Sequence, residues 1–139
     1  MRNQKNPVPL EDDEAIAFAR WLRVNRIPAT HIANEIGGST NAAKIRALKA
    51  KKMGQTAGVW DYEVFVPIRD LDGEVAAYQE LRIEMKRTKG GTVSQAQKDW
   101  GNVYEMAGIP CKVCRGAGEA IEYVRGWIKN VNGDDSDEK

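Results

Sequence analysis

The sequence has few of the features that mark a secreted or membrane protein. Only 2 of its 139 residues are cysteine, which is too few for a disulfide framework. No apolar run approaches the roughly 20 residues of a transmembrane helix, and the N-terminus lacks the apolar segment of a signal peptide. With 139 residues, of which 42% are hydrophobic and 29% are charged, the chain can bury a core without disulfide bonds. We therefore expect a compact, cytoplasmic domain without a membrane partner.

The chain also has almost no excess of charge of one sign, because 21 Lys and Arg oppose 20 Asp and Glu and leave a net charge of +1. The charges are unevenly distributed. The last six residues hold four acids and one base, a charge of −3, which leaves +4 on residues 1–133. Between Ser39 and Met53 lie five bases and no acid: Lys44, Arg46, Lys49, Lys51 and Lys52. This stretch is either the solvated face of a helix or a surface that contacts phosphates.

Hydrophobic periodicity predicts helices and strands in mixed order. Helices are expected over residues 10–23, 41–53, 94–107 and 118–130, and strands over residues 29–36, 62–67, 75–86 and 109–115. An Asp-Gly turn at residues 72–73 joins the second and third strands as a hairpin. The order α-β-α-β-β-α-β-α predicts one α/β domain over residues 10–130, with a mixed sheet flanked by helices. Residues 1–9 are expected to be a flexible segment and residues 131–139 a disordered acidic tail.

The segment most informative about chemistry is residues 83–86. Because side chains two apart on a strand share a face, Glu84 and Lys86 project together. The predicted hairpin brings Asp61 beside Glu84, and two adjacent carboxylates repel each other unless a cation or a proton lies between them. Carboxylate oxygens suit Mg²⁺ or Mn²⁺. With Lys86 nearby, these groups are the parts of metal-dependent phosphodiester hydrolysis; incidental surface ion pairs are the alternative.

Four segments, in this order, resemble the VRR-NUC family, the virus-type replication-repair nucleases of the PD-(D/E)XK superfamily. They are residues 14–21 (EAIAFARW), 34–35 (NE), 58–61 (GVWD), and 83–86 (IEMK) followed by 94–100 (SQAQKDW). The resemblance extends from about Glu11 to Ile128. It implies a restriction-endonuclease-like core and a Mg²⁺- or Mn²⁺-dependent, structure-specific DNA endonuclease. Small stand-alone members resemble homodimeric four-way (Holliday) junction resolvases; a nuclease for flaps or other branched DNA and a non-catalytic DNA-binding module are the alternatives.

The resemblance also assigns roles to individual residues. It implies a metal site formed by three carboxylates and one backbone carbonyl, those of Glu14, Asp61, Glu84 and Met85. Lys86 matches the motif lysine of the catalytic set, and Gln97 matches a helical glutamine that lies beside it. One position departs from the family, because Trp60 stands where a proline usually precedes the motif aspartate. At this position Trp60 could stack on a base or a sugar.

Six bases are expected to hold the DNA backbone that flanks the site: Lys44, Lys49, Lys51, Lys52, Arg87 and Lys89. Contacts of this kind position DNA without reading its base sequence. We therefore expect the protein to recognise the shape of its DNA substrate.

Several residues have competing interpretations. Glu14 is preferred over its acidic neighbours because it lies four positions before Phe18, on the expected buried stripe of its helix. His31, the single histidine, is expected to be a structural residue without a part in the mechanism. Cys111 and Cys114 would face opposite sides of a strand, and no further cysteine completes a zinc site. The sequence therefore predicts two core or half-buried thiols and no zinc.

Overall fold

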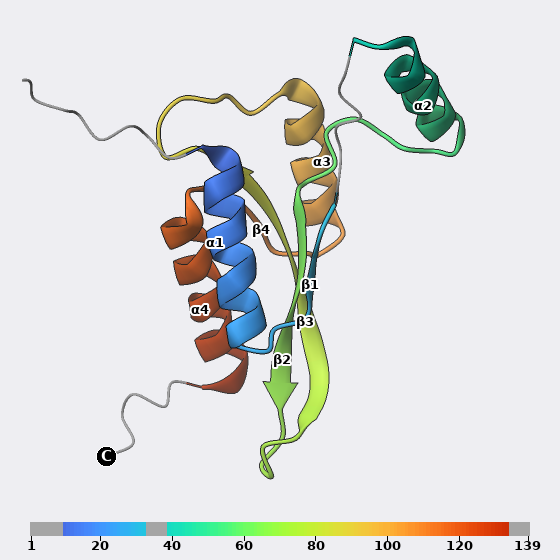
Figure 1. Ribbon diagram of the computed structural model, residues 1–139. Coiled ribbons are helices and arrows are strands. Elements are labelled where there is room, and N and C mark those ends of the chain that lie inside the picture. Colours follow the sequence, from blue (N-terminus) through green and yellow to red (C-terminus); the bar gives the residue numbers. More distant parts are fainter. Residues whose placement is uncertain (1–9, 33–38, 134–139) are drawn as a thin grey trace, which may run out of the picture.

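The computed structural model describes residues 10–32 and 39–133, which form an α/β domain (Figure 1). Along the chain the elements are α1 (Glu11–Val24), β1 (Ala29–His31), α2 (Asn41–Lys52), β2 (Tyr62–Arg69), β3 (Val75–Lys86), α3 (Gln95–Met106), β4 (Cys111–Arg115) and α4 (Ala117–Asn132). The predicted order of helices and strands is therefore confirmed.

Several predicted boundaries differ from the structure by one or two residues, and the end of the first strand differs by more. The strand expected over residues 29–36 is a strand at Ala29–His31, and residues 33–38, with the Asn-Glu pair at 34–35, lie outside the described residues. The final helix continues two residues beyond its predicted end, to Asn132. The Asn132 side chain explains this extension, because it donates to the Pro67 carbonyl and accepts from the Arg69 backbone N–H, both at 2.8 Å. Residues 1–9 and 134–139 also lie outside the described residues.

The strands form one mixed sheet in the order β1-β2-β3-β4. The pairs β1–β2 and β2–β3 are antiparallel, whereas β3 and β4 pair in parallel. A parallel pair needs a crossover, which α3 supplies. The register of the β2–β3 hairpin pairs Tyr62 with Ile83. Asp61, directly before β2, therefore lies at the same end of the hairpin as Glu84.

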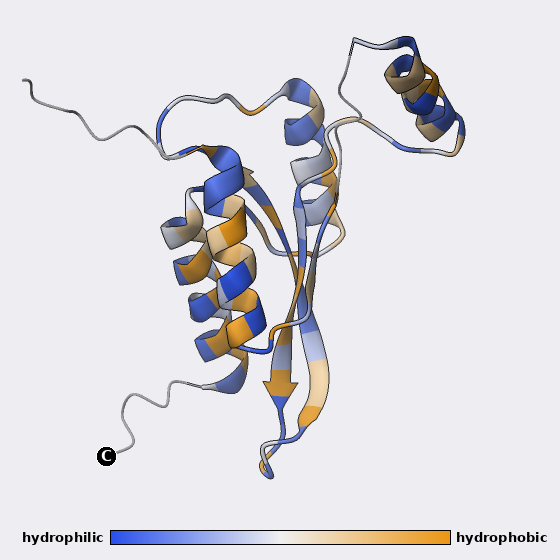
Figure 2. Ribbon diagram, in the orientation of Figure 1, coloured by the Kyte–Doolittle hydropathy of each residue, from blue (hydrophilic) through white to orange (hydrophobic). Residues whose placement is uncertain are grey.

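The main core lies between the sheet and the helices α1 and α4, which cover one of its faces (Figure 1). Alternate residues from Tyr62 to Val66 of β2 and from Leu81 to Met85 of β3 point into this core, among them the fully buried Val64, Leu81 and Ile83. α1 contributes Phe18 and Leu22. Figure 2 shows hydrophobic segments alternating with hydrophilic ones along α1 and α4, as expected of helices with one buried side. This core determines which residues of β3 point to the opposite face.

The helix α3 packs against that opposite face and holds a second, smaller cluster of side chains. Trp60 and Tyr104 are both buried, with ring centroids 5.5 Å apart in an edge-on arrangement. The Arg82 guanidinium of β3 lies 5.3 Å from the centre of the Tyr104 ring. By contrast, α2 stands apart from the sheet in Figure 1. Among the described helices, none is both long enough and apolar enough to cross a membrane.

Candidate active site

The hairpin of β2 and β3 brings together two carboxylates that are 23 residues apart in the sequence. The backbone N–H of Asp61 donates to Glu84 Oε2 at 3.1 Å. In return, Asp61 Oδ2 accepts from the backbone N–H of Met85 at 3.0 Å. Each carboxylate is therefore held by the backbone of the strand that carries the other. The predicted closeness of Asp61 and Glu84 is confirmed.

Glu84 is almost fully buried, with 2% of its surface exposed. Its Oε1 accepts a hydrogen bond from Gln97 Nε2 at 2.6 Å and lies 3.4 Å from Lys86 Nζ. Burial is the main cause that raises the pKa of Glu84 from 4.5 to about 7; the negative charge of Asp61 adds to this shift, and Lys86 opposes it. The ionised form of Glu84 thus needs more positive charge than Lys86 alone supplies.

Gln97 is placed by the local structure at the start of α3. Ser94 caps this helix, and Ser94 Oγ accepts from the Gln97 N–H while Gln97 Oε1 accepts from the Ser94 N–H at 2.9 Å. This capping box uses the Gln97 oxygen and leaves its Nε2 to donate to Glu84. Gln97 therefore contacts Glu84, the same carboxylate that Lys86 approaches, and its part in the mechanism stays a prediction.

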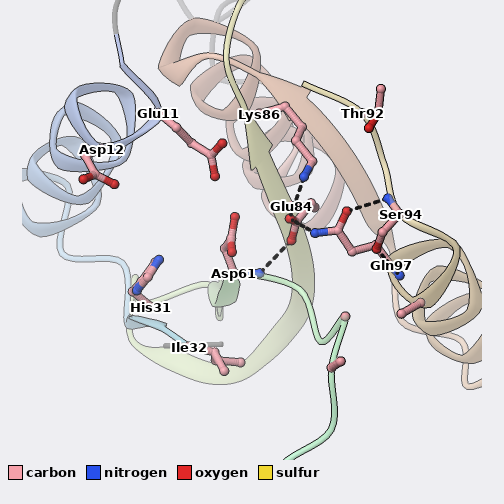
Figure 3. Close-up of a pocket in the computed structure, with 13 residues that line it drawn as sticks. Glu11, Asp12, His31, Ile32, Asp61, Glu84, Lys86, Thr92, Ser94 and Gln97 are labelled. Atoms are coloured by element: carbon pink, nitrogen blue, oxygen red, sulfur yellow. Dashed lines mark hydrogen bonds and ion pairs between the residues drawn. The ribbon is translucent and has the colours of Figure 1, made fainter. Parts of the chain in front are cut away.

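These side chains open onto a cavity of about 670 Å³ between α1, β1 and the start of α3 (Figure 3). Asp61, Glu84, Lys86 and Gln97 line one side of this cavity. In Figure 3, Lys86 and Gln97 both reach toward Glu84, from β3 and α3 respectively. The cavity combines carboxylates, one lysine and a helix N-terminus, a combination that suits a cation and a phosphate together.

The structure places the acidic residue of the first helix, Glu14, outside the lining of the cavity, and its role as a metal ligand stays a prediction. Glu14 does not line the cavity, because its Oε2 accepts a hydrogen bond from the backbone N–H of Ala117 at 2.5 Å. Ala117 begins α4, and the residue before it, Gly116, has no side chain that could cap this helix. Glu14 supplies the missing cap from another helix. It lies on the inward face of α1, as expected, but that face meets α4 here.

Glu11 and Asp12 are the residues of α1 that line the cavity in place of Glu14. His31 of β1 also lines it, although the sequence predicts no part for this residue. The pairing of β1 with β2 brings His31 here, since the N–H of the next residue, Ile32, donates to the Asp61 carbonyl at 2.6 Å. The sequence does not reveal this pairing, because β1 has only three residues.

Trp60 does not have the exposed ring that stacking on a base would require. It is 5% exposed, and its indole Nε1 donates to the Gln97 carbonyl at 2.8 Å. The ring lies against Gly101 of α3, where a Cβ atom would be only 2.8 Å from Trp60 Cζ2. The stacking interpretation of Trp60 is therefore wrong.

The residues predicted to hold DNA are separated from the cavity. None of them lines it, and four belong to α2, which Figure 1 shows apart from the sheet: Lys44, Lys49, Lys51 and Lys52. Those four and Lys89 are exposed. Arg87 is half-buried, and its Nε is buried without a hydrogen-bond partner in the part of the chain that the structure describes. A role in DNA contact stays a prediction for all six.

The chemistry of the donor set fits a hard divalent cation. Two carboxylates lie side by side, and burial disfavours a bare negative charge on Glu84. Within residues 10–32 and 39–133, no three His, Cys, Asp or Glu side chains are grouped closely enough to hold a metal ion by themselves. Mg²⁺ commonly takes one or two carboxylates and completes its shell with water and substrate phosphate. Asp61, Glu84 and the Met85 carbonyl would suit such a site.

Comparison with known proteins gives one informative likeness. No protein-family model and no curated protein matches the chain. A solved structure described as a "VRR_NUC domain protein" superposes on it with a TM-score of 0.65, and the match covers 92% of this chain and 95% of the other at 23% sequence identity. At this identity the likeness establishes the fold. The chain therefore shares the α/β fold of that VRR_NUC domain protein, which agrees with the mixed α/β architecture predicted from the sequence.

Proposed function

We propose that this protein is a metal-dependent, structure-specific DNA endonuclease of the VRR-NUC family. The observation that carries the proposal is the pair Asp61 and Glu84, joined through the backbone of two strands and placed beside Lys86 in an open cavity. The chain shares the fold of a VRR_NUC domain protein. The resemblance to the VRR-NUC family predicts Asp61, Glu84 and Lys86 together in such a fold. DNA is accordingly the expected substrate, and the cytoplasm the expected location.

The residues of the cavity have separable tasks in phosphodiester hydrolysis. A bound Mg²⁺ or Mn²⁺ would supply Lewis acidity and lower the pKa of the attacking water. Asp61, Glu84 and the Met85 carbonyl would hold this ion. Lys86, whose Nζ is 3.4 Å from Glu84, orients the water or stabilises charge that develops on the phosphate. Gln97 keeps the Glu84 carboxylate turned toward Asp61.

The start of α3 offers a second favourable feature for a phosphate. Ser94, Ala96 and Gln97 line the cavity, and the first turn of this helix contains no acidic residue. A helix N-terminus carries a partial positive charge and unpaired N–H groups, which favour anions. The scissile phosphate would therefore lie between the carboxylate pair and α3.

The shape of the substrate is the finer part of the proposal. The basic helix α2 would contact the DNA backbone at a distance from the cut, so recognition would depend on DNA shape rather than on bases. A four-way junction is the favoured substrate, because its symmetry requires paired cuts and a two-fold homodimer supplies paired sites. A flap or another branched DNA is the second candidate.

A cleavage assay with labelled four-way junction, flap and linear duplex DNA tests the proposal. We expect cleavage of the junction with Mg²⁺ or Mn²⁺, none with a chelator, and a loss of about 100-fold or more in Asp61→Ala and Lys86→Ala. Glu122→Ala, which removes an exposed acid of α4, is the matched control and should cleave normally.

The results separate the candidate functions. Cleavage that persists in chelator, or in both active-site variants, would refute the metal-nuclease mechanism. Equal rates on junction and linear duplex would refute the junction specificity alone. Binding of branched DNA without cleavage under any metal would identify a non-catalytic DNA-binding module.

A further inference from the structure

Trp60 belongs to the loop of residues 53–61 that precedes β2, here called the catalytic loop, and its ring fills a closely fitted space against α3. Its ring rests on Gly101, where even a methyl group would approach Cζ2 to 2.8 Å, and meets the edge of Tyr104 at 5.5 Å between centroids. Only 5% of its surface is exposed. The ring therefore has one position relative to α3, and any change in its size or polarity is transmitted to that helix.

Two hydrogen bonds join Trp60 to α3. Its indole Nε1 donates to the Gln97 carbonyl at 2.8 Å, and its backbone N–H donates to the Tyr104 hydroxyl at 3.3 Å. A proline at this position could form neither bond, since it has no N–H and no indole. The departure from the family's usual proline thus adds two contacts at this point in the chain.

The residue that Trp60 holds is the one that orients Glu84. The carbonyl of Gln97 receives the indole N–H, and the side chain of the same Gln97 donates to Glu84 Oε1 at 2.6 Å. The other oxygen of Glu84 accepts from the N–H of Asp61, the residue that follows Trp60. Asp61 therefore holds one oxygen of Glu84 directly, and the preceding residue, Trp60, holds the other through Gln97.

We propose that Trp60 is a positioning residue: the capping box holds the Gln97 side chain on α3, and Trp60 fixes the start of α3 relative to Asp61, which together set the direction of the Glu84 carboxylate. The ring of contacts from Trp60 through Gln97 and Glu84 to Asp61 closes on itself, because Asp61 is bonded to Trp60 in the chain. The effect of Trp60 on catalysis rests on the proposed nuclease function. The effect of Trp60 on the position of Gln97 can be tested without that function, because it is a property of the protein without metal or DNA.

A second tryptophan provides a matched control. Trp100 of α3 also joins this helix to the catalytic loop, because its indole Nε1 donates to the Ala57 carbonyl at 3.2 Å. It also packs on Tyr104, with centroids 5.8 Å apart. Its bond ends on Ala57 rather than on Gln97, so Trp100→Phe removes a similar contact without acting on the Glu84 carboxylate.

The direct test is the NMR signal of the Gln97 side-chain amide in Trp60→Phe and Trp100→Phe, assigned by its disappearance in Gln97→Ala. In the wild type we expect a shifted, slowly exchanging signal, because Nε2 donates to a buried carboxylate. In Trp60→Phe the chemical shift and exchange rate of the Gln97 amide should move toward those of a free amide, whereas in Trp100→Phe both should equal those of the wild type. An unchanged signal in Trp60→Phe, or equal changes in both variants, would overturn the proposal.

Activity and metal binding give the second readout. We expect Trp60→Phe to lower kcat and Mn²⁺ affinity by about tenfold with little change in KM for DNA, whereas Trp100→Phe stays within about twofold. Gly101→Ala displaces the same indole from the other side and should reproduce the amide shift if Trp60→Phe does not fold. A wild type that neither binds Mn²⁺ nor cleaves DNA would refute the proposed function, while the amide signal would still decide the role of Trp60.

Discussion

At the scale of single residues, the site is defined by how each carboxylate is satisfied. Asp61 and Glu84 are each bonded to the backbone of the other's strand, so neither can turn away without breaking a hydrogen bond. Glu14 is equally well satisfied, but by the first turn of α4. The spacing of residues along a helix or strand indicates which way a side chain points. It does not indicate which partner lies in that direction.

The raised pKa of Glu84 predicts a pH dependence of stability in the metal-free protein. The unfolded chain loses the Glu84 proton near pH 4.5, whereas the folded protein keeps it until about pH 7. The folded state binds more protons in this window, so the free energy of unfolding should fall as the pH rises from 4.5 to 7, by at most about 3 kcal/mol, and then level off. Urea denaturation in chelator at pH 5 and pH 8 measures this loss.

The control for this prediction is Glu84→Gln, which cannot titrate at this position. The free energies of unfolding of Glu84→Gln and of the wild type should differ, and this difference should change between pH 5 and pH 8. Added Mn²⁺ should restore the wild type at pH 8, since the ion replaces the missing proton, and should not affect Glu84→Gln to the same extent. Parallel pH profiles of the two proteins would contradict the prediction.

At the scale of elements, the two sides of the sheet have different tasks. α1 and α4 form the main core on one face, and this core fixes β3 so that Glu84 and Lys86 emerge on the other. α3 covers the second face only near the end of the hairpin, where its capping box brings Gln97 to Glu84. α2 takes part in neither layer (Figure 1).

The position and charge of α2 predict a role in DNA affinity that is separate from catalysis. Replacing Lys49, Lys51 and Lys52 together with Gln should weaken DNA binding about tenfold or more and reduce its salt dependence, because fewer counterions are released. The melting temperature should hardly change, since all three side chains are exposed. Titration of labelled junction DNA at several salt concentrations measures both effects.

The matched control removes three bases from the opposite side of the molecule: Arg20, Arg23 and Lys129, all exposed on α1 and α4. Its net charge is the same as that of the α2 variant, so a general loss of positive charge would affect both proteins equally. Equal losses of affinity would show that α2 has no specific contact with DNA.

At the scale of the whole molecule, the net charge is near zero although positive and negative charges are concentrated in different segments of the chain. The basic α2 and the acidic end of the sequence nearly cancel in the total of +1. The carboxylates of the cavity also count as negative charges, although a bound cation would offset them. If DNA binds as we propose, the surface that faces it would be more positive than the total suggests.

The junction proposal predicts a homodimer in solution. One copy has one cavity of this composition in the described residues, whereas paired cuts need two. Analytical ultracentrifugation should therefore give about twice the chain mass of 15.5 kDa at micromolar concentration. Glu84→Gln, which alters the site without altering the surface, should sediment in the same way. A monomer at all concentrations would remove the symmetric junction mechanism and favour the flap substrate.

The sequence by itself determined the local features of this protein. Periodicity and turn residues predicted the order of helices and strands, because they depend on contacts between residues near one another in the chain. The turn residues also predicted the hairpin that brings Asp61 to Glu84, and the capping box of Gln97 forms within the first turn of α3. These features, together with Lys86, are the centre of the candidate site.

Only the tertiary structure decided which distant groups meet. It turned Glu14 to the N-terminus of α4, brought His31 and Glu11 to the cavity, and buried Trp60 against Gly101 of α3. Each outcome depends on how helices pack against the sheet and against each other, and many packings are compatible with one local pattern. The packing, rather than the motif, therefore determined which side chains face the cavity and which support it from behind.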